Sequence, residues 1–220
     1  AGMFRLMGVV PLALRLPSAI AGILTTLATY WLGRELLAAW RQRDDRTPHP
    51  TSLTPASWVP LIAALYLATS YWHVHFSRFG IRGVFTPLFG SLAFAAFWRG
   101  ANRNSYRWFA FAGACVGLAA NFYTAGRFYP FFLGGFLLVQ WLVTAPTRRR
   151  EQAILPRCFW KIVILYGVAG LVFAPLAAYF LSHPGSFGQR ASVVTAFGSE
   201  NPWVQMGQAA LANVAQFFAP

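Results

Sequence analysis

Long runs of apolar residues separated by short polar segments dominate this chain. Six runs are nearly free of charged residues, and they cover residues 18–33, 58–72, 84–98, 108–123, 128–143 and 162–181. A helix that crosses the hydrocarbon core of a membrane needs about 20 residues, so the shorter runs need Trp, Tyr, His or Arg side chains at the membrane surface. The pattern predicts six membrane-spanning helices and an all-α, polytopic transmembrane helical bundle.

The C-terminal stretch departs from this pattern. After residue 203, Gln205, Gln208, Asn213 and Gln216 interrupt the apolar residues. This mixture predicts a helix that lies in the outer membrane interface rather than a seventh span. In this interpretation residues 1–220 are a single transmembrane domain. Since the chain does not begin with Met, we expect it to be a fragment of a longer protein, without its first outer loop and its C-terminal part.

Two glycines in the fourth run predict close helix packing. Gly113 and Gly117 are four positions apart, a spacing that puts both on one helical face. Small residues at such positions let two helix backbones approach each other within a membrane.

Composition excludes a soluble globular domain. Hydrophobic residues make up 57% of the chain and charged residues only 10%, far from the balance of soluble domains. The net charge of +13 does not predict a nucleic-acid partner, because the basic residues fall between the apolar runs instead of forming one patch. The sequence contains no Gly-rich phosphate loop, Ser-His-Asp series or cysteine cluster.

The basic residues predict the orientation of the spans. Twelve of the eighteen follow the first, third and fifth runs, namely Arg34, Arg41, Arg43, Arg46, Arg99, Arg103, Arg107, Arg148, Arg149, Arg150, Arg157 and Lys161. Loops rich in Lys and Arg are cytoplasmic by the positive-inside tendency. The other six are then on the outer side or at its membrane edge, namely Arg5, Arg15, Arg78, Arg82, Arg127 and Arg190. We therefore predict a multi-pass protein of the cell membrane, surrounded by membrane lipid.

The predicted outer loop at residues 73–83 is rich in groups that bind phosphate. Arg78 and Arg82 are four positions apart, and His75 precedes them among aromatic and glycine residues. In a helix both guanidinium groups would lie on one face, and two planar forks suit a phosphate or pyrophosphate. A headgroup anchor is the alternative for each of these arginines.

Two further outer segments repeat this combination. Tyr123 and Arg127 lie in residues 123–130, and Arg190 follows a Pro-Gly pair in residues 183–190. Such a surface suits a lipid-linked phosphate at the membrane edge, with aromatic rings receiving sugar rings. The candidate substrate-binding residues are therefore Arg78, Arg82, Arg127, Arg190, Tyr123 and His75.

Acidic residues are scarce, which leaves the catalytic group unknown. Glu35, Asp44, Asp45 and Glu151 fall on the predicted cytoplasmic side in the company of arginines, and Glu200 alone faces outward. Glycosyl transfer uses a carboxylate as a base or to stabilise positive charge on the sugar. A metal site needs at least three converging ligands, so a divalent metal has no support and no other cofactor is predicted.

Several short motifs, taken in order, resemble a known family. Residues 15–22 read Arg-Leu-Pro-Ser-Ala-Ile-Ala-Gly and open a span that closes with Tyr-Trp-Leu-Gly-Arg at 30–34. They resemble the segment after the first outer loop in integral membrane glycosyltransferases of the protein O-mannosyltransferase and aminoarabinose transferase type. Ser-Arg-Phe-Gly-Ile-Arg at 77–82, Thr-Pro-Leu-Phe at 86–89, Arg127 with Pro130, and residues 184–190 also resemble bacterial members.

The resemblance implies a GT-C fold and a transferase. Such enzymes move a sugar from a polyprenyl-phosphate donor to a lipid, polysaccharide or protein acceptor on the outer side of the membrane. Their essential acid belongs to a first outer loop, upstream of Arg15 here, so we expect this fragment to be inactive by itself. Many relatives also carry an Asp shortly after the Ser-Arg pair, where residues 83–87 contain no acid.

Two other classes of protein stay open. A transporter or flippase-like membrane subunit would use the outer arginines to line an anion path, and it would carry charged residues buried in the middle of spans or paired broken helices. A scaffold without catalysis would use the arginines only as headgroup anchors.

Overall fold

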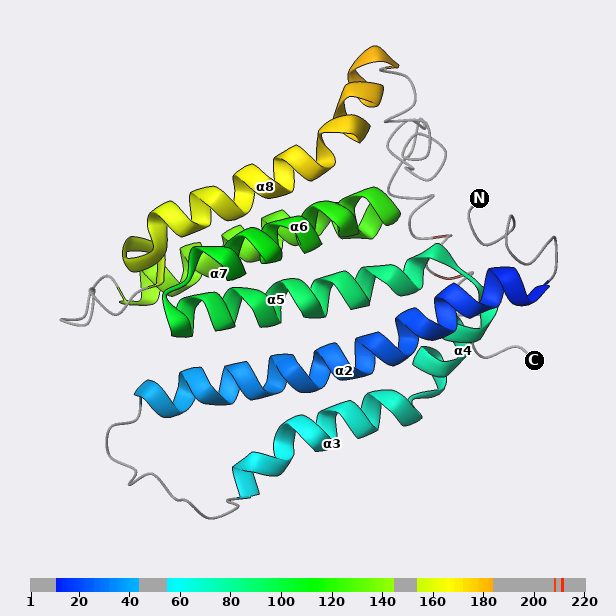
Figure 1. The fold of residues 1–220 in the computed structure, drawn as a ribbon, viewed down its shortest axis with the longest axis horizontal. Coiled ribbons are helices and arrows are strands. Elements are labelled where there is room, and N and C mark those ends of the chain that lie inside the picture. The colour runs from blue at the N-terminus through cyan, green and yellow to red at the C-terminus, as the bar shows by residue number, and fades with distance from the viewer. Residues whose placement is uncertain (1–10, 44–54, 145–153, 184–207, 209–210, 212–220) are drawn as a thin grey trace. The chain divides into compact units, whose positions relative to one another are not determined.

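The computed structural model describes residues 11–43, 55–144, 154–183, 208 and 211. Every element in these residues is helical, which confirms the predicted all-α class. In chain order the elements of Figure 1 are α2 (Pro11–Arg43), α3 (Pro55–Thr69), α4 (Tyr71–Phe79), the 3-10 helix η1 (Arg82–Val84), α5 (Phe85–Arg103), α6 (Tyr106–Phe122), the 3-10 helix η2 (Thr124–Phe128), α7 (Tyr129–Thr144) and α8 (Ile154–Ser182).

Each of the six predicted spans corresponds mainly to one helix, in the order α2, α3, α5, α6, α7 and α8. Three segments are long and apolar enough to cross a membrane, namely Arg15–Ala39, Thr124–Val143 and Cys158–Ser182. The helices α3 and α6 have 15 and 17 residues, which gives at most about 26 Å against a hydrocarbon core of about 30 Å. Three spans are therefore supported by length and composition, and the count of six stays a prediction.

The outer loop expected at residues 73–83 is mostly helical, which corrects the prediction. The second apolar run is broken at Ser70, which is extended (φ −62°, ψ 122°) between α3 and α4. The helix α4 then continues to Phe79 and ends at Gly80, whose φ is 73°. Glycine adopts this left-handed conformation without steric cost and commonly ends helices.

Several basic residues expected in cytoplasmic loops also belong to helices. Arg34 lies inside α2, Arg99 and Arg103 lie in α5, and Lys161 lies in α8. The helices extend past the apolar runs because Arg and Lys are good helix formers whose long side chains reach the membrane surface. The predicted interfacial helix after residue 203 lies outside the described residues, apart from Gln208 and Leu211.

Contacts along α2 show that its neighbour α3 runs in the opposite direction and continues into α4. Gly33, late in α2, packs against Pro60, early in α3. Gly22, near the beginning of α2, packs against Ser77 in α4. The alternation expected for consecutive spans is thus present in these first helices (Figure 1).

The helix α5 runs parallel to α2, and α6 runs antiparallel to α5. Ala21 belongs to a buried cluster with Leu88, and an ion pair joins α2 to α5 about four turns further along. The ring pairs Phe97–Phe109 and Phe89–Phe122 then connect α5 to α6. The bundle thus has two ends: the Arg78 end, where α2 and α5 begin and α4 and α6 finish, and the Glu35 end opposite.

Large buried side chains from four helices form the main core. Phe97, Phe109, Leu137 and Leu165 come from α5, α6, α7 and α8, and each is at most 2% exposed. Many apolar side chains point outward instead, for example Tyr66 (77% exposed) and Phe131 (74%). Apolar surface on this scale is typical of a face covered by lipid or another protein.

Gly113 and Gly117 lie where α6 meets α8, as their spacing predicts. A Cβ atom at Gly113 would overlap the Leu165 carbonyl, and one at Gly117 would lie 2.7 Å from Cβ of Val172. The Asn121 amide donates to the Val172 carbonyl at 2.9 Å on the same face. The prediction of close packing is confirmed.

The chain divides into two compact units, Ala1–Ala174 and Pro175–Pro220. In the second unit, the His183 ring stacks on Tyr179 at 4.6 Å between centroids. The Ser182 hydroxyl donates to the Ala178 carbonyl at 3.1 Å. The single transmembrane domain expected for residues 1–220 stays a prediction.

Candidate functional site

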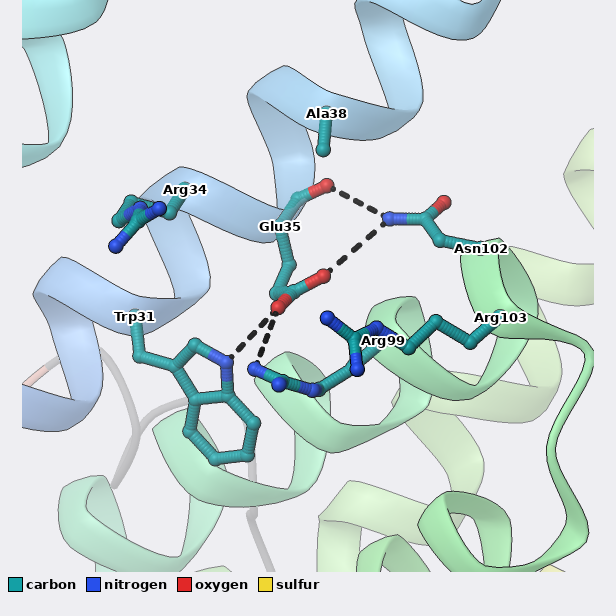
Figure 2. Close-up of a pocket in the computed structure, with 7 residues that line it drawn as sticks. All are labelled: Trp31, Arg34, Glu35, Ala38, Arg99, Asn102 and Arg103. Atoms are coloured by element: carbon teal, nitrogen blue, oxygen red, sulfur yellow. Dashed lines mark hydrogen bonds and ion pairs between the residues drawn. The ribbon is translucent and has the colours of Figure 1, made fainter.

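A polar pocket of about 430 Å³ lies between α2 and α5 at the Glu35 end (Figure 2). We call it the Glu35 pocket, and its lining residues are Trp31, Arg34, Glu35, Ala38, Arg99, Asn102 and Arg103. The four residues from α2 are spaced by three, one and three positions, and the three from α5 by three and one. Both spacings place side chains on one helical face, so two parallel helices present their polar faces to each other.

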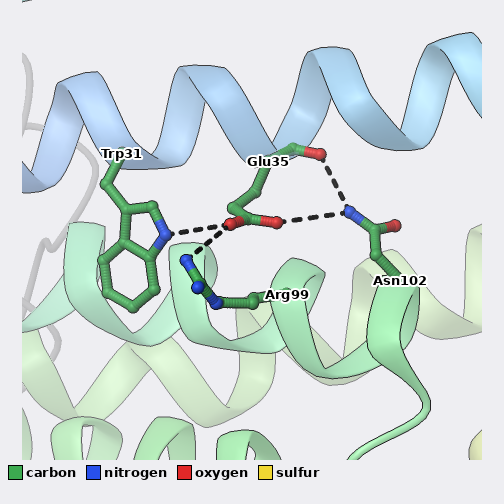
Figure 3. A network of polar contacts seen from close by, with 4 residues as sticks. All are labelled: Trp31, Glu35, Arg99 and Asn102. Carbon is green, nitrogen blue, oxygen red and sulfur yellow. Dashed lines mark hydrogen bonds and ion pairs between the residues drawn. The ribbon is translucent and has the colours of Figure 1, made fainter.

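Three donors hold the Glu35 side chain in this pocket (Figure 3). The Trp31 indole N–H donates to Glu35 Oε1 at 3.0 Å, and Arg99 Nη1 donates to the same oxygen at 3.1 Å. The Asn102 amide donates to the Glu35 main-chain carbonyl at 3.1 Å and to Oε2 at 3.5 Å. The side chains of Arg99 and Glu35 are 26% and 14% exposed. These contacts fix the position of the Glu35 carboxylate between α2 and α5.

Two tryptophan rings fix the Arg99 guanidinium. Its central carbon lies 4.6 Å from the Trp108 ring centroid and 5.6 Å from that of Trp31. The two rings meet edge to face at 5.5 Å. Such cation–π contacts attract an arginine to a ring face, so Arg99 is oriented by aromatic packing as well as by Glu35.

The pocket carries more positive than negative charge. Three guanidinium groups line it, and Glu35 supplies the one carboxylate of its lining. Arg34 and Arg103 are exposed, and Arg34 lies 5.9 Å from the Tyr30 ring centroid. Arg99 and Glu35 form an ion pair in this pocket.

A second hollow of about 270 Å³ lies between α2, α3 and α4 at the Arg78 end. We call it the Arg78 groove, and it is lined by Ala19, Gly22, Ile23, Thr26, Ala68, His73, Val74, Ser77 and Arg78. A His73 ring nitrogen, Nε2, lies 3.1 Å from the Gly22 carbonyl, and the Ser77 hydroxyl donates to the His73 carbonyl at 2.7 Å. The His73–Gly22 contact joins α4 to α2, whereas the Ser77–His73 bond lies within α4. Arg78 supplies the one charged side chain of the lining.

Arg78 and Arg82 do not share a helical face, so that expectation is wrong. Arg78 is in the last turn of α4, Gly80 ends the helix in the left-handed conformation, and Arg82 begins η1. Both arginines are exposed, and Arg78 alone of the two lines the groove. The glycine between them decides this, because it lets the chain leave the helix at Gly80.

His75 belongs to an aromatic cluster on α4. Its ring stacks on Tyr71 at 5.3 Å and lies 4.5 Å from the Phe79 ring. Trp72 and Phe76 complete the cluster. His75 is not among the residues that line the groove.

Tyr123 and Arg127 also lie at the Arg78 end, where α6 finishes. Tyr123 is exposed and extended, and it connects α6 to η2, which contains Arg127. Gly126 packs onto the backbone of Ala119, so η2 folds back on α6. Neither Tyr123 nor Arg127 lines the Arg78 groove, and Arg190 lies outside the described residues.

The sequence interpretation missed the Glu35 pocket as a site, although it placed Glu35 in the company of arginines. The Arg99–Glu35 ion pair confirms that an arginine lies beside Glu35. The available signal was the four-residue spacing of Trp31 and Glu35, which allows an indole to donate to a carboxylate on one helical face. No pattern in the sequence pairs α2 with α5.

Neither hollow contains a recognisable metal site. Among the described residues, no three His, Cys, Asp or Glu side chains gather in a way that would hold a metal ion. Cys115 and Cys158 are both buried, and they form no disulfide within the described residues. Comparison with protein-family models, with curated proteins and with solved structures gave no match to this chain.

Proposed function

We propose that this chain is part of a multi-pass cell-membrane glycosyltransferase that takes a sugar from a polyprenyl-phosphate donor. The acceptor would be a lipid, polysaccharide or protein on the outer side of the membrane. The observation that carries the proposal is the Arg78 groove, in which one guanidinium borders a mainly apolar lining. The order of the short motifs from Arg15 to Arg127 supports the same class of enzyme.

The lining of the groove suits a phosphate attached to an isoprenoid chain. Ala19, Ile23, Ala68 and Val74 offer apolar contacts to a hydrocarbon, and Arg78 offers N–H donors to a phosphate. Ligand sites commonly combine an apolar lining with a few placed polar groups. Arginine binds phosphate oxygens with two parallel hydrogen bonds, which adds both energy and direction.

The other predicted substrate-binding residues that the structure describes lie toward the same end of the bundle. Arg82, Tyr123 and Arg127 lie at the Arg78 end, near the turns that follow α4 and α6. There they would contact the sugar or the acceptor, and His75 would offer a ring face from its aromatic cluster. The catalytic carboxylate is expected upstream of Arg15.

No specific observation favours the transporter alternative. Such a protein would carry charged residues buried in the middle of its spans. Lys161, the charged residue that is buried most deeply among the described ones, lies near the beginning of α8. There it donates to the Asn104 side chain at 2.6 Å.

The test is donor turnover by the full-length protein with radiolabelled polyprenyl-phosphate sugars. Arg78→Lys keeps the charge but loses the planar guanidinium group. We therefore expect donor turnover to fall about tenfold to hundredfold for each lost contact. Arg107→Lys is the matched control, because Arg107 is exposed at the opposite end. Arg82→Lys measures whether this second arginine contributes despite the break at Gly80.

Near wild-type turnover in Arg78→Lys would contradict the phosphate contact. A headgroup anchor tolerates Lys as well as Arg, because both side chains extend to the membrane surface. If no lipid-linked sugar is consumed by the full-length protein, the transferase itself is wrong.

A further inference from the structure

The Glu35 pocket contains more positively charged groups than its one ion pair involves. Glu35 accepts from Trp31 and from Arg99, which leaves Arg34 and Arg103 as additional guanidiniums in the lining. The lining therefore carries two more positive charges than negative ones. Each arginine offers five N–H donors and no acceptor, so the pocket is suited to an anion with several oxygens.

We propose that the Glu35 pocket is a second binding site, for a phosphate group that belongs either to a free phosphorylated anion or to the headgroup of an anionic lipid. The site lies at the end of the bundle opposite the Arg78 groove, and it does not depend on the proposed transferase activity. The guanidinium groups of the lining, those of Arg34, Arg99 and Arg103, would supply the hydrogen-bond donors to the phosphate. Figure 2 shows Arg103 extending from α5 toward the region of the Glu35 carboxylate.

The arrangement of Arg99 prepares the pocket for such a ligand. Trp31 and Trp108 both contact its guanidinium, so less conformational freedom is lost when an anion binds. Its Nε is buried and has no hydrogen-bond partner within the described residues. The volume of about 430 Å³ leaves room for a group larger than a single ion.

Glu35 affects phosphate binding in two opposite ways. Its negative charge lies beside the proposed phosphate and repels it, while its contact with Arg99 keeps the cationic wall in place. Removing the charge and retaining the shape, as in Glu35→Gln, leaves three positive charges opposed by none in the lining. Affinity for a phosphate should therefore rise in this variant, whereas a pocket that binds cations would lose affinity.

The experiment uses the full chain in detergent micelles and in lipid nanodiscs. Inorganic pyrophosphate is titrated calorimetrically against the micellar protein. In the second arm, native mass spectrometry compares retained phosphatidylglycerol with retained phosphatidylcholine. The variants are Arg34→Gln, Arg103→Gln and Glu35→Gln, and Arg107→Gln is the control because Arg107 is exposed near the same end without lining the pocket.

We expect binding in at least one arm, weakened about tenfold to hundredfold by Arg34→Gln or Arg103→Gln for each lost contact. Glu35→Gln should strengthen binding, and Arg107→Gln should leave it unchanged. Pyrophosphate binding assigns the site to a free anion, and selective retention of phosphatidylglycerol alone assigns it to a lipid headgroup. Absence of binding in both arms would overturn the proposal. Equal losses in Arg103→Gln and Arg107→Gln would do the same, because they indicate general attraction to a basic surface.

Discussion

Arg99 Nη1 lies 3.1 Å from Glu35 Oε1, although the two residues are 64 positions apart in the chain. This contact joins two parallel helices, α2 and α5, at the end of the bundle where their polar faces meet. The pair is partly buried, and its stabilisation is therefore screened less than that of a surface ion pair. Its contribution to stability is open to direct measurement.

A double-mutant cycle with Glu35→Gln and Arg99→Gln should give a coupling energy of about 1 to 2 kcal/mol, within the range for residues in direct contact. The free energy of unfolding is measured in mixed micelles for the wild type, the two single variants and the double variant. The cycle of Glu35→Gln with Arg107→Gln is the control, because Arg107 does not contact Glu35. Additivity in both cycles would mean that the ion pair contributes nothing.

Gly113→Ala should destabilise the protein by about 1 to 3 kcal/mol, the usual cost of overpacking. The added methyl group would overlap the Leu165 carbonyl, and the backbones of α6 and α8 would have to separate. Gly135→Ala is a matched control, because nothing lies within 4 Å of a Cβ atom there. It should be neutral or slightly stabilising, since Ala favours a helix over Gly. Equal effects at both positions would contradict close packing of α6 on α8.

Asn104→Ala should be about 1 kcal/mol less stable than Asn104→Gly. Asn104 ends α5 with a φ of 55°, in the left-handed region, where alanine is strained and glycine is not. Both variants lose the hydrogen bond from Lys161, so their difference in unfolding free energy isolates the backbone conformation. If Asn104→Ala is as stable as Asn104→Gly, the left-handed end of α5 is not maintained in the folded protein.

Cysteines at positions 78 and 103 should react from opposite sides of the membrane. Arg78 and Arg103 are exposed at the two ends of the bundle, and the positive-inside tendency puts Arg103 in the cytoplasm. In a variant lacking Cys115 and Cys158, an impermeant reagent should label Arg78→Cys in intact cells. Arg103→Cys should be labelled only after permeabilisation. Labelling of both variants in intact cells would contradict the predicted topology.

The positions of the helices were predictable because they depend on local properties of the chain. The apolar run at residues 108–123 matches α6 (Tyr106–Phe122) within two residues at each end. A run of this kind hides its backbone polar groups by hydrogen bonding within the segment, whatever its neighbours are. The packing role of Gly113 and Gly117 was also predictable, since two missing side chains on one face leave room for a second backbone.

The candidate sites were decided by the tertiary structure. Of the predicted substrate-binding residues, Arg78 lines a groove, because the hydrogen bond between His73 and the Gly22 carbonyl brings α4 onto α2. Arg82 is separated from it by Gly80, whose left-handed conformation ends the helix at Phe79, three residues before Arg82, so the two arginines share no helical face.

The Glu35 pocket was likewise predictable only in part from the sequence. The sequence by itself determined that Glu35 would have arginines nearby, since its region is rich in them. Which arginine meets it depends on α5 lying parallel to α2 and on Trp31 and Trp108 holding Arg99 in place. Helix pairing is set by side-chain packing over many residues distant in sequence, and no local pattern encodes it. The spans follow from the solvent around each segment, whereas the sites follow from which helices become neighbours.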